Sequence, residues 1–377
     1  MAIISYGRLD KKLILILLFT ILREVYTIIM DNAPDDYHYF RLDALSEDLG
    51  YALAGIIMYL IFKKKKNPKE KDKRSFKYLI ILFCLIAIKS SYEHVYHYAI
   101  HYNQNYIYYR ILNAVNGIEI ILMSAATFLI FKYKYYLHHI ITMIIYCILG
   151  FSIDIILGNF KDISYDYVYF FIIFIISEVL IYCYIKYMMD KIYYHYTEMI
   201  LYYTSFGFFT KLCIFSGFAI YQYINNTNEL INEAKIYFEE NNIFTIIFLQ
   251  FFYFFFHGGC FNTLVMLILF YFKPNHTIIS NEFNDYFNTV IYGDNPNKLY
   301  TIIPFVLQIL ALIFYFEILE LNFLQLNKNT TKNIQLREGK EDQERLLSEV
   351  SVIELENQYL VNENEMNNGN DSFASKK

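Results

Sequence analysis

The stretch DYVYFFIIFIISEVLIYCYIKYMMDKIYYHYTEMILYYTSFGFFTKLCIFSGFAIY, residues 166–221, contains the pattern that decides the fold. It consists of two apolar runs, 166–186 and 198–221, joined by a short turn that contains charged residues. A helix needs about 20 apolar residues to cross about 30 Å of hydrocarbon, so each run is long enough for one crossing. The stretch therefore predicts two membrane-spanning helices. Each contains an ionisable residue well inside its apolar run, Glu178 in the first and Lys211 in the second.

Apolar runs of the same kind occupy most of the chain before residue 325. They lie at 13–30, 49–62, 76–98, 110–131, 138–158, 243–272, 277–291 and 300–321. Hydrophobic residues make up 56% of the sequence and charged residues 18%, whereas roughly 25% of residues are charged in soluble proteins. This balance excludes a soluble enzyme, a secreted disulfide scaffold and a disordered chain. We predict an all-α polytopic membrane protein with about ten transmembrane helices in residues 1–325, followed by a polar tail at 326–377.

Two of these runs allow a second interpretation. The run 13–30 resembles a signal peptide, but no small-residue cleavage site follows its core, so we retain it as a span. The run 277–291 contains five asparagine or acidic residues, and its apolar residues recur at helical spacing. It is either a span whose polar face lines a cavity or an amphipathic helix at the membrane surface, which leaves nine spans. The pattern alone leaves both open.

The basic residues predict the orientation of the spans. With ten spans and a cytosolic N-terminus, the inner segments carry 17 Lys and Arg residues and the outer loops carry five. Because cytosolic loops are enriched in these residues, both termini are predicted to be cytosolic. We interpret the densest segment, Lys63–Lys77, as a topology anchor; an anionic-lipid or nucleic-acid patch is the alternative. Membrane lipids are the expected surroundings, without nucleic acid, and the sequence does not distinguish an endomembrane from the plasma membrane.

Ionisable side chains inside apolar runs are costly and usually face a cavity or a partner. We predict that a set of such residues lines a substrate pathway for a small-molecule solute. The alternative is that they form interhelical ion pairs, for instance Lys89 with Glu119. The set consists of Arg23, Glu24, Lys89, Glu119, Glu178, Lys211 and His257.

Histidines raise the question of a metal site. His94, His97 and His101 share one helical face, but the model of ten spans puts them at the outer end of their span and His138-His139 at the inner start of another. One metal cannot collect both groups across the membrane. We interpret His94, His97 and His101 as an interfacial face and expect no bound metal; a site made of these three histidines alone is the alternative. The sequence contains no Gly-rich phosphate loop or nucleophile elbow, so we expect no cofactor and no catalytic residues.

Three stretches together resemble the drug/metabolite transporter superfamily, which includes nucleotide-sugar carriers. The first is Arg110–Gly150, with the small residues Ser124-Ala125-Ala126, a Lys-rich turn and a span ending near a glycine. The second is SEVLIYCYIKYMMDKIYYHYTEMILYYTSFG, residues 177–207, where a charged turn leads to Glu198 at the start of the next helix. The third is NTLVMLILFYFKPNHTIISNEF, residues 262–283, where a turn precedes a polar ninth span. This third likeness favours 277–291 as a span.

The resemblance implies two inverted five-helix repeats, at about 1–160 and 161–325, with the substrate bound between them. It also implies alternating access by rocking of the repeats. In such a repeat Glu24 matches Glu178, and Lys89 matches His257. The chain departs from the family's nucleotide-sugar and phosphosugar carriers, because it lacks their basic pair late in the ninth span. A phosphorylated or nucleotide substrate is therefore not indicated.

Beyond the spans, two short motifs are candidates for modification or sorting. Asn225 begins an Asn-Asn-Thr sequence in a predicted outer loop, where it can accept a glycan. In the tail, Asp342, Leu346 and Leu347 resemble an acidic dileucine signal that a vesicle adaptor reads; a charged amphipathic helix is the alternative.

The sequence favours a membrane transporter for a small organic solute that works by alternating access, with proton coupling through carboxylates as a hypothesis. A non-transporting receptor or scaffold with a cytosolic partner-binding tail is the alternative, and a membrane-embedded lipid enzyme is a third hypothesis. We expect the chain not to be an enzyme. The sequence indicates neither the solute nor the coupling ion.

Overall fold

The structure is a computed structural model of the 377-residue chain. The residues that it describes are 4–6, 13–31, 40–62, 74–103, 107–133, 135–157, 165–225, 227, 231–232, 235, 238–239, 243–291, 298–321, 330, 333–334 and 336–337.

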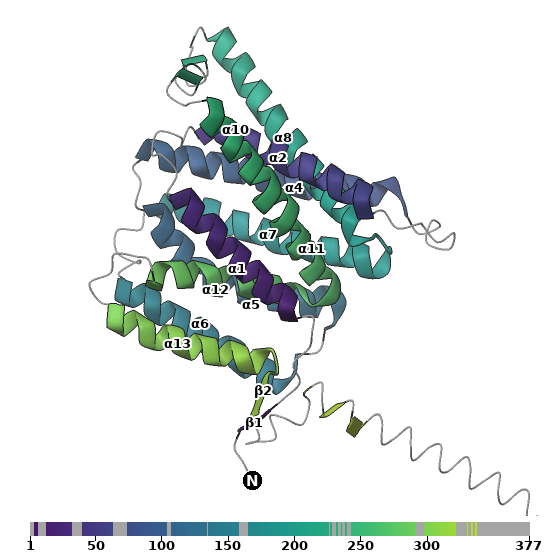
Figure 1. Cartoon of the computed structure of the whole chain (residues 1–377), viewed down its shortest axis with the longest axis vertical. Helices are drawn as coiled ribbons and strands as arrows, with labels where there is room; N and C mark the ends of the chain where they lie inside the picture. Colours follow the sequence, from purple (N-terminus) through teal and green to yellow (C-terminus); the bar gives the residue numbers. More distant parts are fainter. Residues whose placement is uncertain are drawn as a thin grey trace, which may run out of the picture. The chain divides into compact units, whose positions relative to one another are not determined.

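Helices dominate the described residues, as the apolar runs predict (Figure 1). Two strands of three residues each, β1 (Ile4–Tyr6) and β2 (Leu319–Leu321), pair as an antiparallel ribbon in which Ser5 lies opposite Glu320. The helices are α1 (Leu13–Asp31), α2 (Phe40–Phe62), α4 (Phe76–Asn103), α5 (Ile107–Phe131), α6 (Leu137–Leu157), α7 (Tyr165–Lys191), α8 (Tyr196–Ile224), α10 (Ile243–Phe252), η2 (Tyr253–Phe261), α11 (Asn262–Tyr271), α12 (Pro274–Ile291) and α13 (Lys298–Tyr315).

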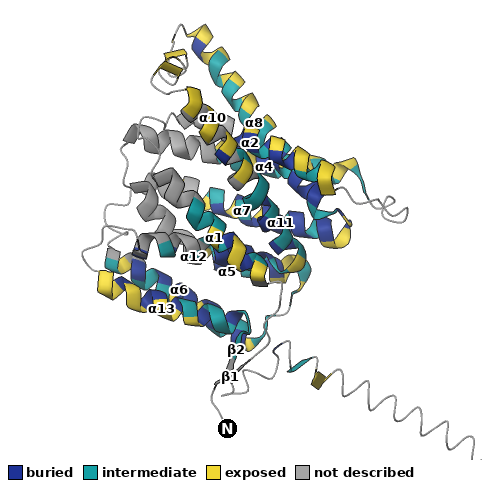
Figure 2. Ribbon diagram, in the orientation of Figure 1, coloured by how far each residue is buried: buried dark blue, intermediate teal, exposed yellow. Residues whose placement is uncertain are grey.

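Within the described part of the chain, three helical segments are long and apolar enough to cross a membrane: Ile172–Lys191, Tyr196–Ile224 and Lys298–Tyr315. Buried and exposed residues alternate along the described helices (Figure 2), and large apolar side chains are found in both groups. Leu129 exposes 74% of its surface, whereas Thr127 on the same helix and Asn275 on α12 are fully buried. Large exposed apolar surfaces are rare on soluble monomers and are expected where helices face lipid.

The eighth apolar run, 243–272, forms one helical path with an irregular middle. α10 leads into a π-helix, η2, which contains Gly258-Gly259, and α11 continues from it. Glycine is a poor helix former, and π-helical turns often occur at functional sites. The length of this run, with Gly258-Gly259 at its middle, predicts that it tilts or breaks; the described path stays helical and becomes a π-helix there.

The ninth run forms α12, which Pro274 opens. Proline is favoured in a first helical turn because its missing N–H has no partner there. Thr277, Ile278, Ile279 and Ser280 are all at most 3% exposed. Four consecutive helical positions point in different directions around the axis, so this half of α12 is surrounded on all sides. Its neighbours are α1, α5 and α11. This burial favours a place inside the bundle over an amphipathic helix at the membrane surface.

Two helix ends differ from the apolar runs. The tenth run, 300–321, is wrong at its end, because α13 ends at Tyr315 and the chain turns into β2. The second run, 49–62, was expected to extend back to Leu45, and α2 starts still earlier, at Phe40. The helix therefore includes Asp48, which the ten-span interpretation counts with the first outer loop. Apolar residues alone indicate neither a closing turn nor a polar first turn.

The described residues divide into two compact units. A small unit contains those of Met1–Leu9, Tyr136–His139 and Ile313–Lys377, and therefore the β1–β2 ribbon. A large unit contains those of Asp10–Tyr135 and Ile140–Leu312. Within the large unit, α2 packs against α8 and η2, and α4 packs against α7 and α8. In addition, α5 contacts α7 and α12, and α1 contacts η2, α11 and α12.

These contacts are mirrored between two sets of helices. We call α1, α2, α4, α5 and α6 the first five helices, and α7, α8, α10–η2–α11, α12 and α13 the last five. The contact of α4 with α7 corresponds to that of α11 with α1, and the contact of α5 with α7 corresponds to that of α12 with α1. Likewise, α4 with α8 corresponds to η2 with α2.

Three further contacts join a helix of the first five to its own counterpart among the last five. They are α2 with α8, α5 with α12, and α6 with α13, where Gln308 Nε2 donates to the carbonyl of Tyr146 over 3.2 Å. Among the described residues the match is partial, because the contacts of α7 with α11 and α12 have no counterpart of similar extent between α1 and α4 or α5.

The contact between α2 and α8 depends on a small residue. A Cβ on Gly55 would overlap the hydroxyl of Thr204, which itself donates to the carbonyl of Ile200 over 2.8 Å. Small residues let two membrane helices approach closely. Gly207, also on α8, has open space where a Cβ would lie.

We expect Gly55→Ala to destabilise the chain by about 1–3 kcal/mol, because the added methyl group overpacks the α2–α8 contact. Gly207→Ala is the matched control and should be neutral or stabilising by up to about 1 kcal/mol, because alanine favours a helix. Thermal unfolding of the purified chains in detergent measures both. Equal effects of the two substitutions would contradict this description of the helix contact.

Candidate functional site

A buried ion pair joins α4 to α7. Lys89 Nζ lies 3.6 Å from Glu178 Oε1, and each side chain is 15% exposed. The ammonium group also lies 5.2 Å from the centre of the Phe174 ring, in a cation–π arrangement. Because Phe174 and Glu178 are four residues apart, they share one face of α7, and Lys89 lies against that face.

Two more helices contribute charged or phenolic groups to the same place. Tyr182 lies one turn beyond Glu178 on α7 and is 6% exposed. It interacts electrostatically with Glu178, Tyr203 on α8, Lys89 and Glu119 on α5. The central cluster, defined as these five residues, therefore lies where α4, α5, α7 and α8 meet. It brings together three of the residues that the sequence assigned to a pathway and contains charges of both signs.

A second ion pair joins α2 to α8. Lys211 Nζ lies 3.1 Å from Asp48 Oδ2, and the two side chains are 17% and 10% exposed. The sequence identified Lys211 but missed its partner, because Asp48 was placed in a loop.

A third polar contact joins α1 to α12. Arg23 Nη1 donates to Asn281 Oδ1 over 2.6 Å, and its guanidinium group lies 5.8 Å from the centre of the Phe261 ring in η2. Glu24 is the next residue on α1 and is partly buried. The predicted counterpart of Lys89, His257, lies in η2, and its side chain is outside the described residues.

All three contacts join one of the first five helices to one of the last five. Lys89 with Glu178, Asp48 with Lys211, and Arg23 with Asn281 each cross the boundary between the two sets. The polar side chains of the apolar helices are thus concentrated where the two sets meet.

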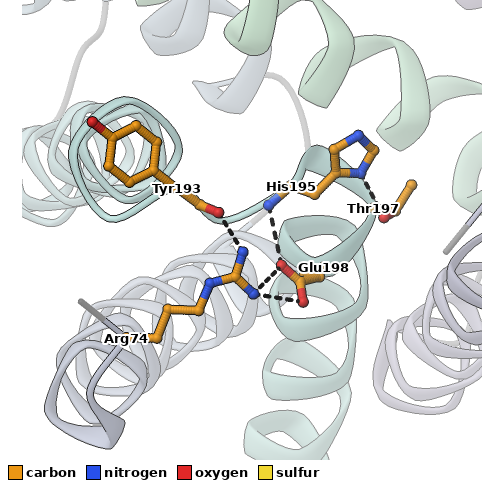
Figure 3. Close-up of polar contacts among 5 residues, drawn as sticks. All are labelled: Arg74, Tyr193, His195, Thr197 and Glu198. Carbon is orange, nitrogen blue, oxygen red and sulfur yellow. Dashed lines mark hydrogen bonds and ion pairs between the residues drawn. The ribbon is translucent and has the colours of Figure 1, made fainter. Parts of the chain in front are cut away.

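The sequence missed a cluster at the start of α8, formed around Arg74 and Glu198 (Figure 3). Arg74 Nη1 donates to both carboxylate oxygens of Glu198, over 2.9 and 2.8 Å, and Nη2 donates to the carbonyl of Tyr193. The guanidinium group lies 4.7 Å from the centre of the Tyr194 ring. Glu198 also accepts a hydrogen bond from the backbone N–H of His195 over 3.1 Å, which caps the helix.

Both side chains of this ion pair are largely buried, Arg74 at 11% and Glu198 at 5% exposure. Arg74, in the basic segment Lys63–Lys77, therefore joins the residues just before α4 to α8. A signal existed in the sequence: Glu198 stands in the first turn of an apolar helix, where capping carboxylates occur. The sequence does not reveal its partner, which lies 124 residues away.

Two tyrosines after α5 connect to the last five helices near the same helix ends. Tyr135 donates to Asn275 Oδ1 over 2.6 Å, and Asn275 Nδ2 donates to Ser124 Oγ over 2.6 Å. Tyr133 donates to Asp190 Oδ2 over 2.9 Å. Burial raises the pKa of Tyr135 to about 12, and burial together with the bond to Asp190 raises that of Tyr133. Both hydroxyls therefore stay protonated and can donate at any physiological pH.

The remaining predicted residues are a glycan acceptor and a sorting motif. Asn225 is exposed at the end of α8, as a glycan acceptor requires. Asp342, Leu346 and Leu347 lie outside the described residues. Among the described residues, one group has the composition of a metal site, and it consists of His138, His139 and Glu317.

No protein-family model and no curated protein matches this sequence.

We expect Arg74→Gln and Glu198→Gln each to destabilise the chain by about 3 kcal/mol, because each leaves the other charge buried without its partner. The double variant should lose less than the sum, because the second substitution removes that remaining charge. Lys77→Ala, an exposed residue of the same basic segment, is the control and should have no effect. Chemical denaturation in detergent measures all four, and strictly additive losses would speak against a coupled pair.

Proposed function

We propose that this chain is a polytopic membrane transporter that moves a small organic solute by alternating access. The observation that carries the proposal is the mirrored contact pattern of the first and last five helices, with buried charges where they meet. Inverted repeats with a binding site between them are the usual construction of secondary transporters. The ten spans, their division into halves at about residue 160 and the cytosolic termini are parts of this proposal.

The extent of exposed apolar surface supports a multi-pass arrangement beyond the three long apolar segments. Shorter apolar helices at Asp48–Phe62, Ile118–Phe131, Leu137–Ile153 and Gly259–Tyr271 pack within the same chain. On α5, for instance, Thr127 is fully buried whereas the neighbouring Phe128 is 59% exposed. A helix that faces lipid on one side and protein on the other is expected to have this distribution.

The central cluster supports a solute with charges of both signs. Lys89 can bind a carboxylate of the solute, and Glu178 and Glu119 can bind an ammonium group. Tyr182 and Tyr203 add hydroxyl donors and aromatic faces. A zwitterion can therefore replace the Lys89–Glu178 ion pair without leaving either charge buried alone, which would be costly.

Protonation of a carboxylate offers a coupling step. When Glu178 binds a proton, its attraction for Lys89 falls, and the contact between α4 and α7 weakens. A proton gradient can then bias which arrangement of the two sets is populated. Glu119 is a second candidate for the same role.

The contacts near the start of α8 support a conformation that is closed at one end. Arg74 with Glu198, Tyr133 with Asp190, and Tyr135 with Asn275 each join the two sets of helices there. By the distribution of basic residues, this end faces the cytosol. Opening towards the cytosol then requires these contacts to break together.

The resemblance to the drug/metabolite transporter superfamily agrees with this proposal in the order of elements and in the turn before α8. The receptor or scaffold alternative depends on the tail after residue 337, which lies outside the described residues. No described contact favours it over transport.

The proposal is tested in liposomes that contain the purified chain and a pH-sensitive dye. We expect zwitterionic solutes from a mixture of amino acids and dipeptides to drive proton entry when added outside. Glu178→Gln should lower the rate at least tenfold, because it removes both the ion pair and the proton acceptor. The exposed Lys235→Gln is the control and should transport like the wild type.

Two outcomes count against the proposal. Rates in Glu178→Gln that equal the wild-type rate, with the same pH dependence, would exclude this residue from the pathway. Uptake of every tested solute at the rate of empty liposomes would contradict transport of this class of solute.

A further inference from the structure

Two adjacent histidines and one glutamate meet within the small unit. His138 and His139 lie in the first turn of α6, and Glu317 lies in the turn after α13. Oε1 of Glu317 is 3.1 Å from Nε2 of His138 and 3.8 Å from Nε2 of His139. One ligand atom from each of the three residues lies within 4.8 Å of the other two.

These separations fit three ligands of one small cation. Zinc binds imidazole nitrogen at about 2.0–2.1 Å and carboxylate oxygen at about 2.0–2.2 Å, so tetrahedral ligands lie about 3.4 Å apart. The distances from Glu317 Oε1 to the two histidine nitrogens, 3.1 and 3.8 Å, lie on either side of this value. Small rotations of the side chains are therefore enough to place all three atoms around one ion.

The backbone of Glu317 is held in an unusual conformation. Its φ of 57° is left-handed, a conformation that glycine usually provides at this position after a helix. The turn is closed by Glu317 N–H, which donates to the carbonyl of Phe314 over 3.1 Å, and by Ile318 N–H, which donates to that of Ile313 over 3.0 Å. A glutamate in place of glycine carries a conformational cost, and such outliers often mark functional positions.

Burial and aromatic contacts restrict the cluster further. The side chain of His138 is 5% exposed, and those of His139 and Glu317 are each 13% exposed. Tyr136 stacks with both imidazole rings, with centroids 6.1 Å apart in each case, and Tyr315 meets His139 edge-on at 5.3 Å. The rings are thus held near one orientation, as ligands of a metal need to be.

We propose that His138, His139 and Glu317 form a binding site for a divalent transition metal, for which Zn²⁺ is the best fit. Imidazole nitrogen and carboxylate oxygen together suit zinc, whereas Mg²⁺ and Ca²⁺ prefer sites made of oxygen alone. Three protein ligands leave a fourth position for water or another donor. The metal joins the start of α6 to the turn that leads from α13 into the β1–β2 ribbon. This site is independent of the transport proposal.

The alternative for the same geometry is a cluster without metal, in which a histidine donates a hydrogen bond to Glu317. A direct measurement of metal binding distinguishes the metal site from this cluster. The full chain is purified in detergent, treated with EDTA and titrated with Zn²⁺ alone by calorimetry, and bound metal is counted by mass spectrometry. We expect one Zn²⁺ per chain and an increase of several degrees in the unfolding temperature. Mg²⁺ at the same concentration should produce neither.

The decisive variant is Glu317→Gly. Glycine suits the left-handed backbone, so this variant should fold at least as well as the wild type and yet bind Zn²⁺ at least tenfold more weakly. His138→Asn should show the same loss, whereas His97→Gln, from the other histidine group of the chain, should bind normally. Absence of stoichiometric Zn²⁺ in the wild type overturns the proposal in favour of the cluster without metal. Unchanged affinity in Glu317→Gly overturns it in favour of a site elsewhere.

Discussion

A charge inside an apolar helix has to find a partner on a neighbouring helix, and the rest of this structure depends on that constraint. Lys89, Lys211 and Arg23 lie deep in apolar runs, and each meets its partner on a helix from the other set of five. The apolar packing around these contacts is less directional than the polar contacts, which specify which helix faces which. The interface between the two sets therefore contains these buried ion pairs.

Buried ion pairs specify geometry more than they add stability. The cost of removing two charges from water roughly offsets their attraction, but breaking one partner away is expensive. An interface built from such pairs is therefore stable in a few discrete arrangements, in each of which every charge has a partner. That property suits an alternating-access transporter, because solute, proton or a second protein group can act as the exchanged partner. A second group of polar contacts between the two sets lies near the helix ends. It consists of the ion pair of Arg74 with Glu198 and the hydrogen bonds of Tyr133 and Tyr135.

The helices were predictable, and most of their partners were not. Each long helix of the described residues coincides with an apolar run of the sequence. The length of the eighth run and its Gly258-Gly259 pair predicted an irregular middle. The pairing of Lys89 with Glu178 depends on the rotation of α4 and α7 about their axes, which hydropathy does not encode. Asp48 and the end of α13 were missed because polar first turns and closing turns have weak signals. The histidine pair was noticed in the sequence, but Glu317 reaches it only through a left-handed turn 178 residues later.

The central claim is that the two sets of helices move relative to each other about this polar boundary. The direct test is a distance measurement by pulsed electron–electron double resonance. Spin labels are attached at two exposed positions, Lys77 on α4 and Lys191 on α7, in a chain whose five native cysteines have been replaced. In liposomes, the account predicts two distance populations, with the longer one enriched by Glu198→Gln. A single narrow distance that Glu198→Gln leaves unchanged would contradict it.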